Sequence, residues 1–176
     1  MASTRLQIPS SDGYALEATR FVPSGASRGV VLMHSATATP QTFYADFAGY
    51  LAQEGFETIT YDYRGIAGSA PLRMRGFRAS MSDWALKDGE GVQRWAFDSY
   101  PDTPVLAVGH SFGGHVIGLA DSSRHLTAAA MVASHAGCLR FLVPWTERLR
   151  VTLIVKGLFP VANAILGYVQ IGRAHV

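Results

Sequence analysis

The chain has 176 residues, of which 48% are hydrophobic and 16% charged, a composition that suits one soluble globular domain. Its 15 basic and 13 acidic side chains leave a formal net charge of +2, which is too small to indicate a nucleic-acid-binding protein. A single cysteine, Cys138, excludes a disulfide framework within the chain. Together with a polar N-terminal segment that lacks a signal-peptide pattern, it favours a cytoplasmic protein.

Strand and helix signals alternate along the first three quarters of the chain. Short β-branched or continuously apolar runs predict strands at residues 5–9, 15–23, 29–34, 57–63, 104–110 and 126–135. Apolar residues at helical spacing predict helices at residues 40–55, 81–101 and 112–123. The order β-β-β-α-β-α-β-α-β indicates an α/β fold with a mainly parallel sheet and helices on both faces.

Two of the predicted helices carry specific signals. In the helix at 40–55, Pro40 marks the start and an apolar stripe is expected to face the core. That stripe consists of Phe43, Phe47, Tyr50 and Leu51. The helix at 81–101 has Ser82 or Asp83 as its N-cap candidate, and its two glycines argue against a straight helix.

The composition changes at residue 142. Residues 151–169 contain one charged residue, Lys156, and one proline, Pro160. The length would permit a membrane span, but a lysine near the middle of such a helix costs about 3 kcal/mol on insertion scales. We therefore expect a globular core over 1–141, an apolar helical lid or cap segment over 142–169, and no membrane span.

A G-x-S-x-G motif lies between the strand at 104–110 and the helix that follows. Its residues are Gly109, His110, Ser111, Phe112 and Gly113. In a sharp strand-to-helix turn, the residues two before and two after the serine approach each other and must be small. Ser111 then lies at a helix N-terminus, where free N–H groups stabilise an oxyanion, although a serine there is also a common helix cap. The amides of Phe112 and, from the loop after residues 29–34, Ala36 are the predicted oxyanion-hole donors.

Three stretches, "VGHSFGGH", "LMHSATA" and "YDYRGIAGSAP", together resemble the α/β-hydrolase superfamily. "RGFRASMSDWALKD" further resembles a bacterial group close to its serine aminopeptidase and monoglyceride-lipase-like branch. The resemblance implies a serine hydrolase for esters or amides with Ser111 as nucleophile and Phe112 and Ala36 as donors. Ser35 and Ala67 replace glycines of the family pattern, the second expected to affect only packing. Asp62 and Arg64 are expected to tie their loop to the sheet.

The other members of a catalytic triad are harder to place. The family order is serine, then acid, then histidine. The carboxylates after Ser111 are Asp121 and Glu147, and Asp121 lies ten residues down the same helix, about 15 Å away. The histidines after Ser111 are His115, His125, His135 and His175. Only His135 ends a predicted strand at the correct sheet edge, so it is the candidate base within the chain, while His34 and His110 are expected to shape the pocket.

The last six residues, "IGRAHV", resemble a translated sequencing-library adapter. We therefore expect residues 170–176 to be a non-native tail rather than a genuine basic one. On this hypothesis the chain is the N-terminal portion of a longer hydrolase, lacks the acid and base, and is itself inactive.

The expected partner is a small ester or acyl substrate. An aminopeptidase, an acyltransferase, a non-catalytic binding protein of the same fold and a membrane-anchored protein remain alternatives. The sequence has no metal-ligand cluster or nucleotide fingerprint, so no metal and no cofactor are expected, and the oligomeric state is not indicated.

Overall fold

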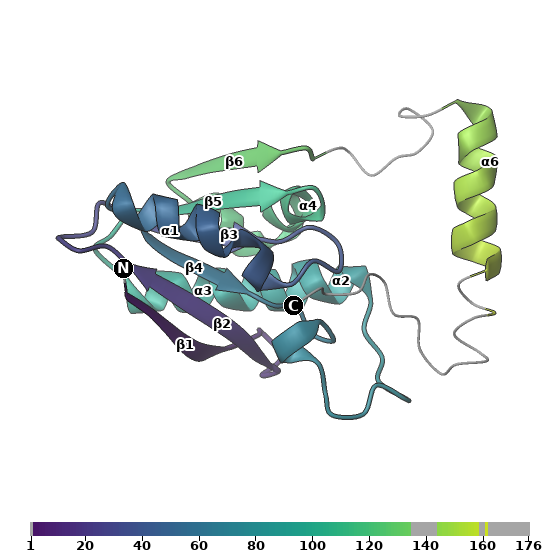
Figure 1. Cartoon of the computed structure of the whole chain (residues 1–176), viewed down its shortest axis with the longest axis horizontal. Helices are drawn as coiled ribbons and strands as arrows, with labels where there is room; N and C mark the ends of the chain where they lie inside the picture. Colours follow the sequence, from purple (N-terminus) through teal and green to yellow (C-terminus); the bar gives the residue numbers. More distant parts are fainter. Residues whose placement is uncertain (1, 135–143, 159–160, 162–176) are drawn as a thin grey trace.

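A six-stranded sheet forms the centre of the computed structural model, which describes residues 2–134, 144–158 and 161 (Figure 1). The strand order is β1-β2-β4-β3-β5-β6. The strands are β1 Ala2–Pro9, β2 Ala15–Val22, β3 Val30–His34, β4 Glu57–Tyr61, β5 Val105–His110 and β6 Ala128–Val132. The first two form an antiparallel hairpin beside β4, whereas β4, β3, β5 and β6 are parallel neighbours. The predicted α/β class with a mainly parallel sheet is confirmed.

Helices cover both faces of the sheet (Figure 1). One face carries the short helix η1, Gln41–Tyr44, and α1, Ala45–Gln53. Alanines of α1 pack over Phe21 of β2. The other face carries α2 Met81–Asp83, η3 Trp84–Gly89, α3 Glu90–Ser99 and α4 Phe112–Leu119, which enclose the main apolar core. The remaining described helices are η2 Ala67–Ser69, η4 Asp121–His125, α6 Trp145–Leu153 and η5 Ile154–Leu158.

The buried face of α1 differs from the predicted one. Phe43, Phe47 and Tyr50 are 69%, 42% and 55% exposed, so the expected core stripe is wrong. The residues that face the sheet are Tyr44, Ala48, Gly49 and Ala52. The small side chains of Ala48, Gly49 and Ala52 let the helix approach the sheet closely.

The elements α2, η3 and α3 form one continuous helical run whose start was misplaced by the sequence pattern. Its N-cap is Ser80 rather than Ser82 or Asp83, and Ser80 forms a capping box with Asp83. The middle of the run, Trp84–Gly89, is a wider π-helical turn. Gly91 lies against the chain at Ser10, where a Cβ atom would be 2.4 Å from the Ser10 Cα, so this glycine allows close packing without breaking the helix.

The C-terminal part contains α6 and η5, within the segment predicted to be a lid. None of the helices described for this chain is long and apolar enough to cross a membrane. Along α6, the apolar residues Trp145, Leu149 and Leu153 recur every four residues and are exposed. The lid and the domain boundaries therefore remain predictions, and the predicted tail at 170–176 lies outside the described residues.

Candidate active site

Ser111 occupies a strained position between β5 and α4. Its backbone φ is 51° and its ψ is −109°, in a region that residues with side chains rarely adopt. A Cβ atom on Gly109 would lie 2.6 Å from the Gly113 carbonyl carbon, and one on Gly113 would lie 2.0 Å from the His34 oxygen. The close approach that the motif predicts on either side of the serine is therefore present, and only glycine fits at both positions.

The backbone amides around Ser111 have distinct partners. The Ser111 N–H donates to the Val132 carbonyl oxygen at 2.9 Å, which fastens the end of β6 to the turn. Phe112 is the first residue of α4, so its N–H has no carbonyl within the helix to which it can donate. The buried Phe112 ring packs edge-on against Tyr63 and Trp84 and so fixes the start of α4. The arrangement leaves the Phe112 amide at the helix N-terminus, where an anion is favoured.

The second predicted donor, Ala36, has a partner that the sequence did not indicate. Its N–H donates to the Tyr44 hydroxyl at 2.9 Å. The same hydroxyl lies 2.9 Å from Nδ1 of His110, the residue before Ser111. Because the hydroxyl oxygen already accepts from Ala36, its own proton is free to bond His110 Nδ1. Tyr44 thus joins the loop after β3 to the serine turn.

The aspartate of the D-x-R-G stretch anchors the same loop from its other end. Asp62 is buried and accepts hydrogen bonds from the Gln41 N–H at 2.7 Å and the Gly68 N–H at 3.1 Å. Burial raises the pKa of Asp62, and these amide donors oppose the shift. Ala67, expected to affect only packing, has φ 38°, a left-handed conformation that suits glycine. The departure from the family pattern therefore strains the backbone.

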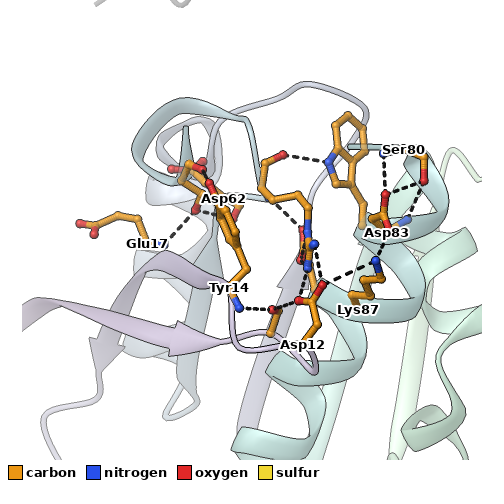
Figure 2. A network of polar contacts seen from close by, with 12 residues as sticks. Asp12, Tyr14, Glu17, Asp62, Ser80, Asp83 and Lys87 are labelled. Carbon is orange, nitrogen blue, oxygen red and sulfur yellow. Dashed lines mark hydrogen bonds and ion pairs between the residues drawn. The ribbon is translucent and has the colours of Figure 1, made fainter. Parts of the chain in front are cut away.

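Arg64 links the same stretch to the helical run and to the β1–β2 turn. Its backbone N–H and Nε donate to the fully buried Asp88 at 2.8 and 2.7 Å, while Nη1 and Nη2 contact Asp12 at 2.9 and 2.6 Å. The pair with Arg64 holds the pKa of Asp12 well below its usual range, whereas burial outweighs the same pairing and raises the pKa of Asp88. Figure 2 shows Lys87 continuing the network from Asp12 to Asp83. Asp62 and Arg64 thus make structural contacts as expected, although Arg64 ties its stretch to a helix and a turn rather than to the sheet.

His34, which was expected to help shape the pocket, is fully buried rather than exposed at the site. Its side chain is fully buried, with Nδ1 2.7 Å from the Tyr61 hydroxyl and Nε2 3.3 Å from Gln93 Nε2. Burial lowers its pKa to about 3, so the imidazole is neutral near pH 7. Its carbonyl oxygen packs against Gly113, so the backbone of His34 supports the turn that carries the serine. His110, which is partly exposed, remains a candidate for shaping the pocket.

The described residues do not assign the remaining triad members. His115 lies one turn along α4 beside the Phe112 ring, and His125 is exposed in η4. Asp121 begins η4, at the opposite end of α4 from the serine, and Glu147 pairs with Arg150 on α6. His135, the candidate base, and His175 lie outside the described residues, as does Cys138. The described residues also contain no cluster of metal-ligating side chains.

A hollow of about 460 Å³ lies away from the serine turn. It is lined by Ile117–Ala120, by residues of η4 and by Ala128 and Ala129 at the start of β6. Since Ser111 precedes α4 and follows the end of β5, this hollow is at the other end of the helix and of the parallel strands. It is not part of the candidate site.

Comparison with known proteins places the fold in a family. The family model described as serine aminopeptidase, S33, matches residues 25–163. An α/β serine hydrolase without lid from Xanthomonas campestris is similar, at 18% identity and a TM-score of 0.63, over 78% of this chain and 63% of that one. A thermostable carboxyl esterase from Bacillus coagulans is similar at 19% identity and a TM-score of 0.63, over 89% of this chain and 52% of that one.

An α/β hydrolase from a Penicillium species gives a similar result, at 18% identity and a TM-score of 0.62, over 94% of this chain and 56% of that one. At these identities the three structures support the fold alone. The chain spans between 52% and 63% of their lengths. The match to the family model covers most of the sequence. This chain belongs to the serine aminopeptidase S33 family of α/β hydrolases.

Proposed function

We propose that this hydrolase cleaves a carboxylic ester, or less readily an amide, with Ser111 as the nucleophile. The observation that carries the proposal is the conformation of Ser111, held at φ 51° between the end of β5 and the N-terminus of α4. Strain of this kind costs of order 1–3 kcal/mol and persists where the surrounding structure enforces it, which is common at catalytic positions. A serine that only capped a helix would not require it, because caps adopt ordinary extended conformations.

The proposed reaction follows the acyl-enzyme pathway. Ser111 Oγ attacks the substrate carbonyl carbon while a general base takes the hydroxyl proton. The carbonyl electrons move to oxygen, and the amides of Phe112 and Ala36 stabilise that oxyanion. Its collapse breaks the bond to the alcohol or amine, which leaves with the proton from the base. In the second half of the reaction, the base takes a proton from water, which attacks the acyl carbon. The same amides stabilise the second oxyanion, and its collapse releases the acid while Ser111 Oγ regains its proton from the base.

The base and acid are proposed to lie outside the described residues. His135 is the candidate base within the chain, and a longer gene product is the other source. The apolar character of residues 142–169 favours an acyl or otherwise hydrophobic substrate, because a lid of that composition would present apolar side chains to it. The carboxyl esterase among the similar structures is consistent with ester cleavage.

The test uses a fluorophosphonate probe on the 176-residue chain and on any longer protein encoded by the same gene. Labelling that disappears in Ser111→Ala supports the nucleophile, and turnover of nitrophenyl esters over aminoacyl amides supports an esterase over an aminopeptidase. Labelling of the longer protein alone places the base beyond residue 169. A different result would indicate a binding protein. In that case the longer protein binds acyl ligands equally well with and without Ser111→Ala, is not labelled by the probe, and does not hydrolyse the substrates.

A further inference from the structure

The Tyr44 hydroxyl contacts both sides of the proposed site. It accepts the Ala36 N–H at 2.9 Å and lies 2.9 Å from His110 Nδ1. Ala36 belongs to the loop that follows β3, and His110 is the last residue of β5, directly before Ser111. A bond to each side fixes the distance between the predicted oxyanion donor and the serine turn. Neither the family motif nor the helix pattern had indicated Tyr44.

The position of this hydroxyl is itself fixed by buried contacts. Tyr44 is 5% exposed and its ring packs edge-on against the His110 ring, with centroids 5.9 Å apart. The helix η1 that carries it begins at Gln41, whose N–H donates to Asp62. The Gln41 side chain makes further bonds to Asp62 at 3.2 Å and, through its oxygen, to Thr60 at 3.0 Å. The start of the helix that carries Tyr44 is therefore fastened to β4 and to the residue that follows it.

The hydroxyl keeps its proton at physiological pH, since burial raises the pKa of Tyr44 above its ordinary value. It can then accept from Ala36 and donate to His110 at the same time. A negatively charged oxygen is a stronger acceptor than a neutral phenol. The substrate oxyanion formed on attack by Ser111 can thus accept the hydrogen bond of the Ala36 N–H in place of the Tyr44 hydroxyl, while Tyr44 keeps its bond to His110.

We infer, on the basis of the function proposed above, that Tyr44 is a positioning residue of the site: its hydroxyl bridges the Ala36 amide and the His110 imidazole and so aligns the oxyanion loop with the nucleophile. Without the hydroxyl, the Ala36 amide loses its partner and the loop from residue 35 to 39 is no longer fastened to the serine turn. The loop then samples positions in which the amide does not face the reacting oxygen. The loss falls on the chemical step rather than on reversible binding.

The variant that tests this is Tyr44→Phe, which removes one oxygen and retains the ring. The matched control is Tyr14→Phe, which removes a hydroxyl that donates to the Ser69 carbonyl at 2.6 Å, away from the serine turn. The experiment uses the form of the protein, short or long, that reacts with the fluorophosphonate probe. We expect Tyr44→Phe to slow the maximal labelling rate by about tenfold or more and to leave the reversible binding constant of the probe little changed. The control should change neither by more than about twofold.

Two measurements on the 176-residue chain do not depend on activity. Amide hydrogen exchange at Ala36 should speed up by about tenfold or more in Tyr44→Phe, and the ¹⁵N shift of His110 Nδ1 should move, with both unaltered in the control. An unchanged labelling rate in Tyr44→Phe, or unchanged exchange at Ala36, would overturn the inference. If no form labels at all, the proposed function fails, and the exchange and ¹⁵N data then decide whether the bridge exists.

Discussion

The buried histidine beneath the serine turn makes stability depend on pH in a defined window. The pKa of His34 is lowered by burial from 6.5 to about 3. Well above pH 6.5 both folded and unfolded chains hold a neutral imidazole, so this residue contributes no pH dependence there. Between pH 6.5 and about 3, the unfolded chain binds a proton that the folded chain does not. Stability is therefore lost as the pH falls through this window.

The size of the loss follows from proton linkage. On going from about pH 7.5 to about pH 5.5, protonation of the unfolded His34 alone should lower the free energy of unfolding by about 1.4 kcal/mol. The folded imidazole does not offset this, because its pKa lies well below the lower pH. His34→Gln removes the titrating group and should flatten the pH dependence by that amount, whatever its effect on stability at neutral pH.

Urea denaturation of the chain, followed by circular dichroism at the two pH values, measures both quantities. Comparing the difference between the pH values, rather than the absolute stabilities, cancels the lost contacts of His34 with Tyr61 and Gln93. His125→Gln, at an exposed position, is the matched control and should keep the wild-type pH dependence. Equal pH dependence in His34→Gln and wild type would refute the reasoning that His34 is neutral because it is buried.

Three further substitutions test the scaffold, each by urea denaturation. Asp88→Ala leaves the Arg64 guanidinium without its buried partner and should lower the free energy of unfolding by about 3 kcal/mol. This is the lower end of the range for a broken buried pair, because Asp12 still contacts Arg64. Gly113→Ala places a Cβ atom 2.0 Å from the His34 carbonyl oxygen and should cost about 3 kcal/mol or more. Ser80→Ala removes an exposed capping box and should cost only about 1 kcal/mol. Equal costs for all three would contradict the burial argument.

Much of the fold was predictable because its signals are local. Each parallel strand is a short run of apolar or β-branched residues. The glycines at positions 109 and 113 are a steric requirement of the G-x-S-x-G motif, which lies within five consecutive residues. The α1 face was not predictable in the same way. Large aromatic residues suggested a core stripe, but Phe43 and Phe47 are exposed, and Ala48 and Ala52 face the sheet. Which side of a helix is buried depends on how closely the sheet must be approached, and that is a tertiary property.

The same distinction applies to the site. Ser111 and its neighbours follow from contiguous residues, whereas the bridge from Tyr44 to Ala36 and His110 joins residues separated by 8 and 66 positions. His34 was expected to shape the pocket because it flanks the predicted site. Its complete burial follows from packing on both sides of β3, between Tyr61 and Gln93. Hydrogen bonds between distant side chains leave no periodic trace in a sequence, which is why these roles were missed.

Backbone strain gathers at the same edge of the sheet as the proposed site. Among the described residues, the non-glycine residues with positive φ are Ala38, Ala67, Ser111 and Ala133. Each lies in the segment that follows one of the four parallel strands, β3, β4, β5 and β6 in turn. Such conformations cost of order 1 kcal/mol or more apiece and are uncommon outside functional regions.

All four strained residues therefore lie beyond the carboxyl ends of neighbouring strands, the edge at which open α/β sheets bind their ligands. The contacts that hold the strain are found there as well. Ser111 is fixed by its bond to Val132, and the loop with Ala38 is fixed between the Tyr44 and Asp62 contacts. The hydrogen bonds of the D-x-R-G stretch thus help to hold these loops in strained conformations that their local sequence alone would not favour.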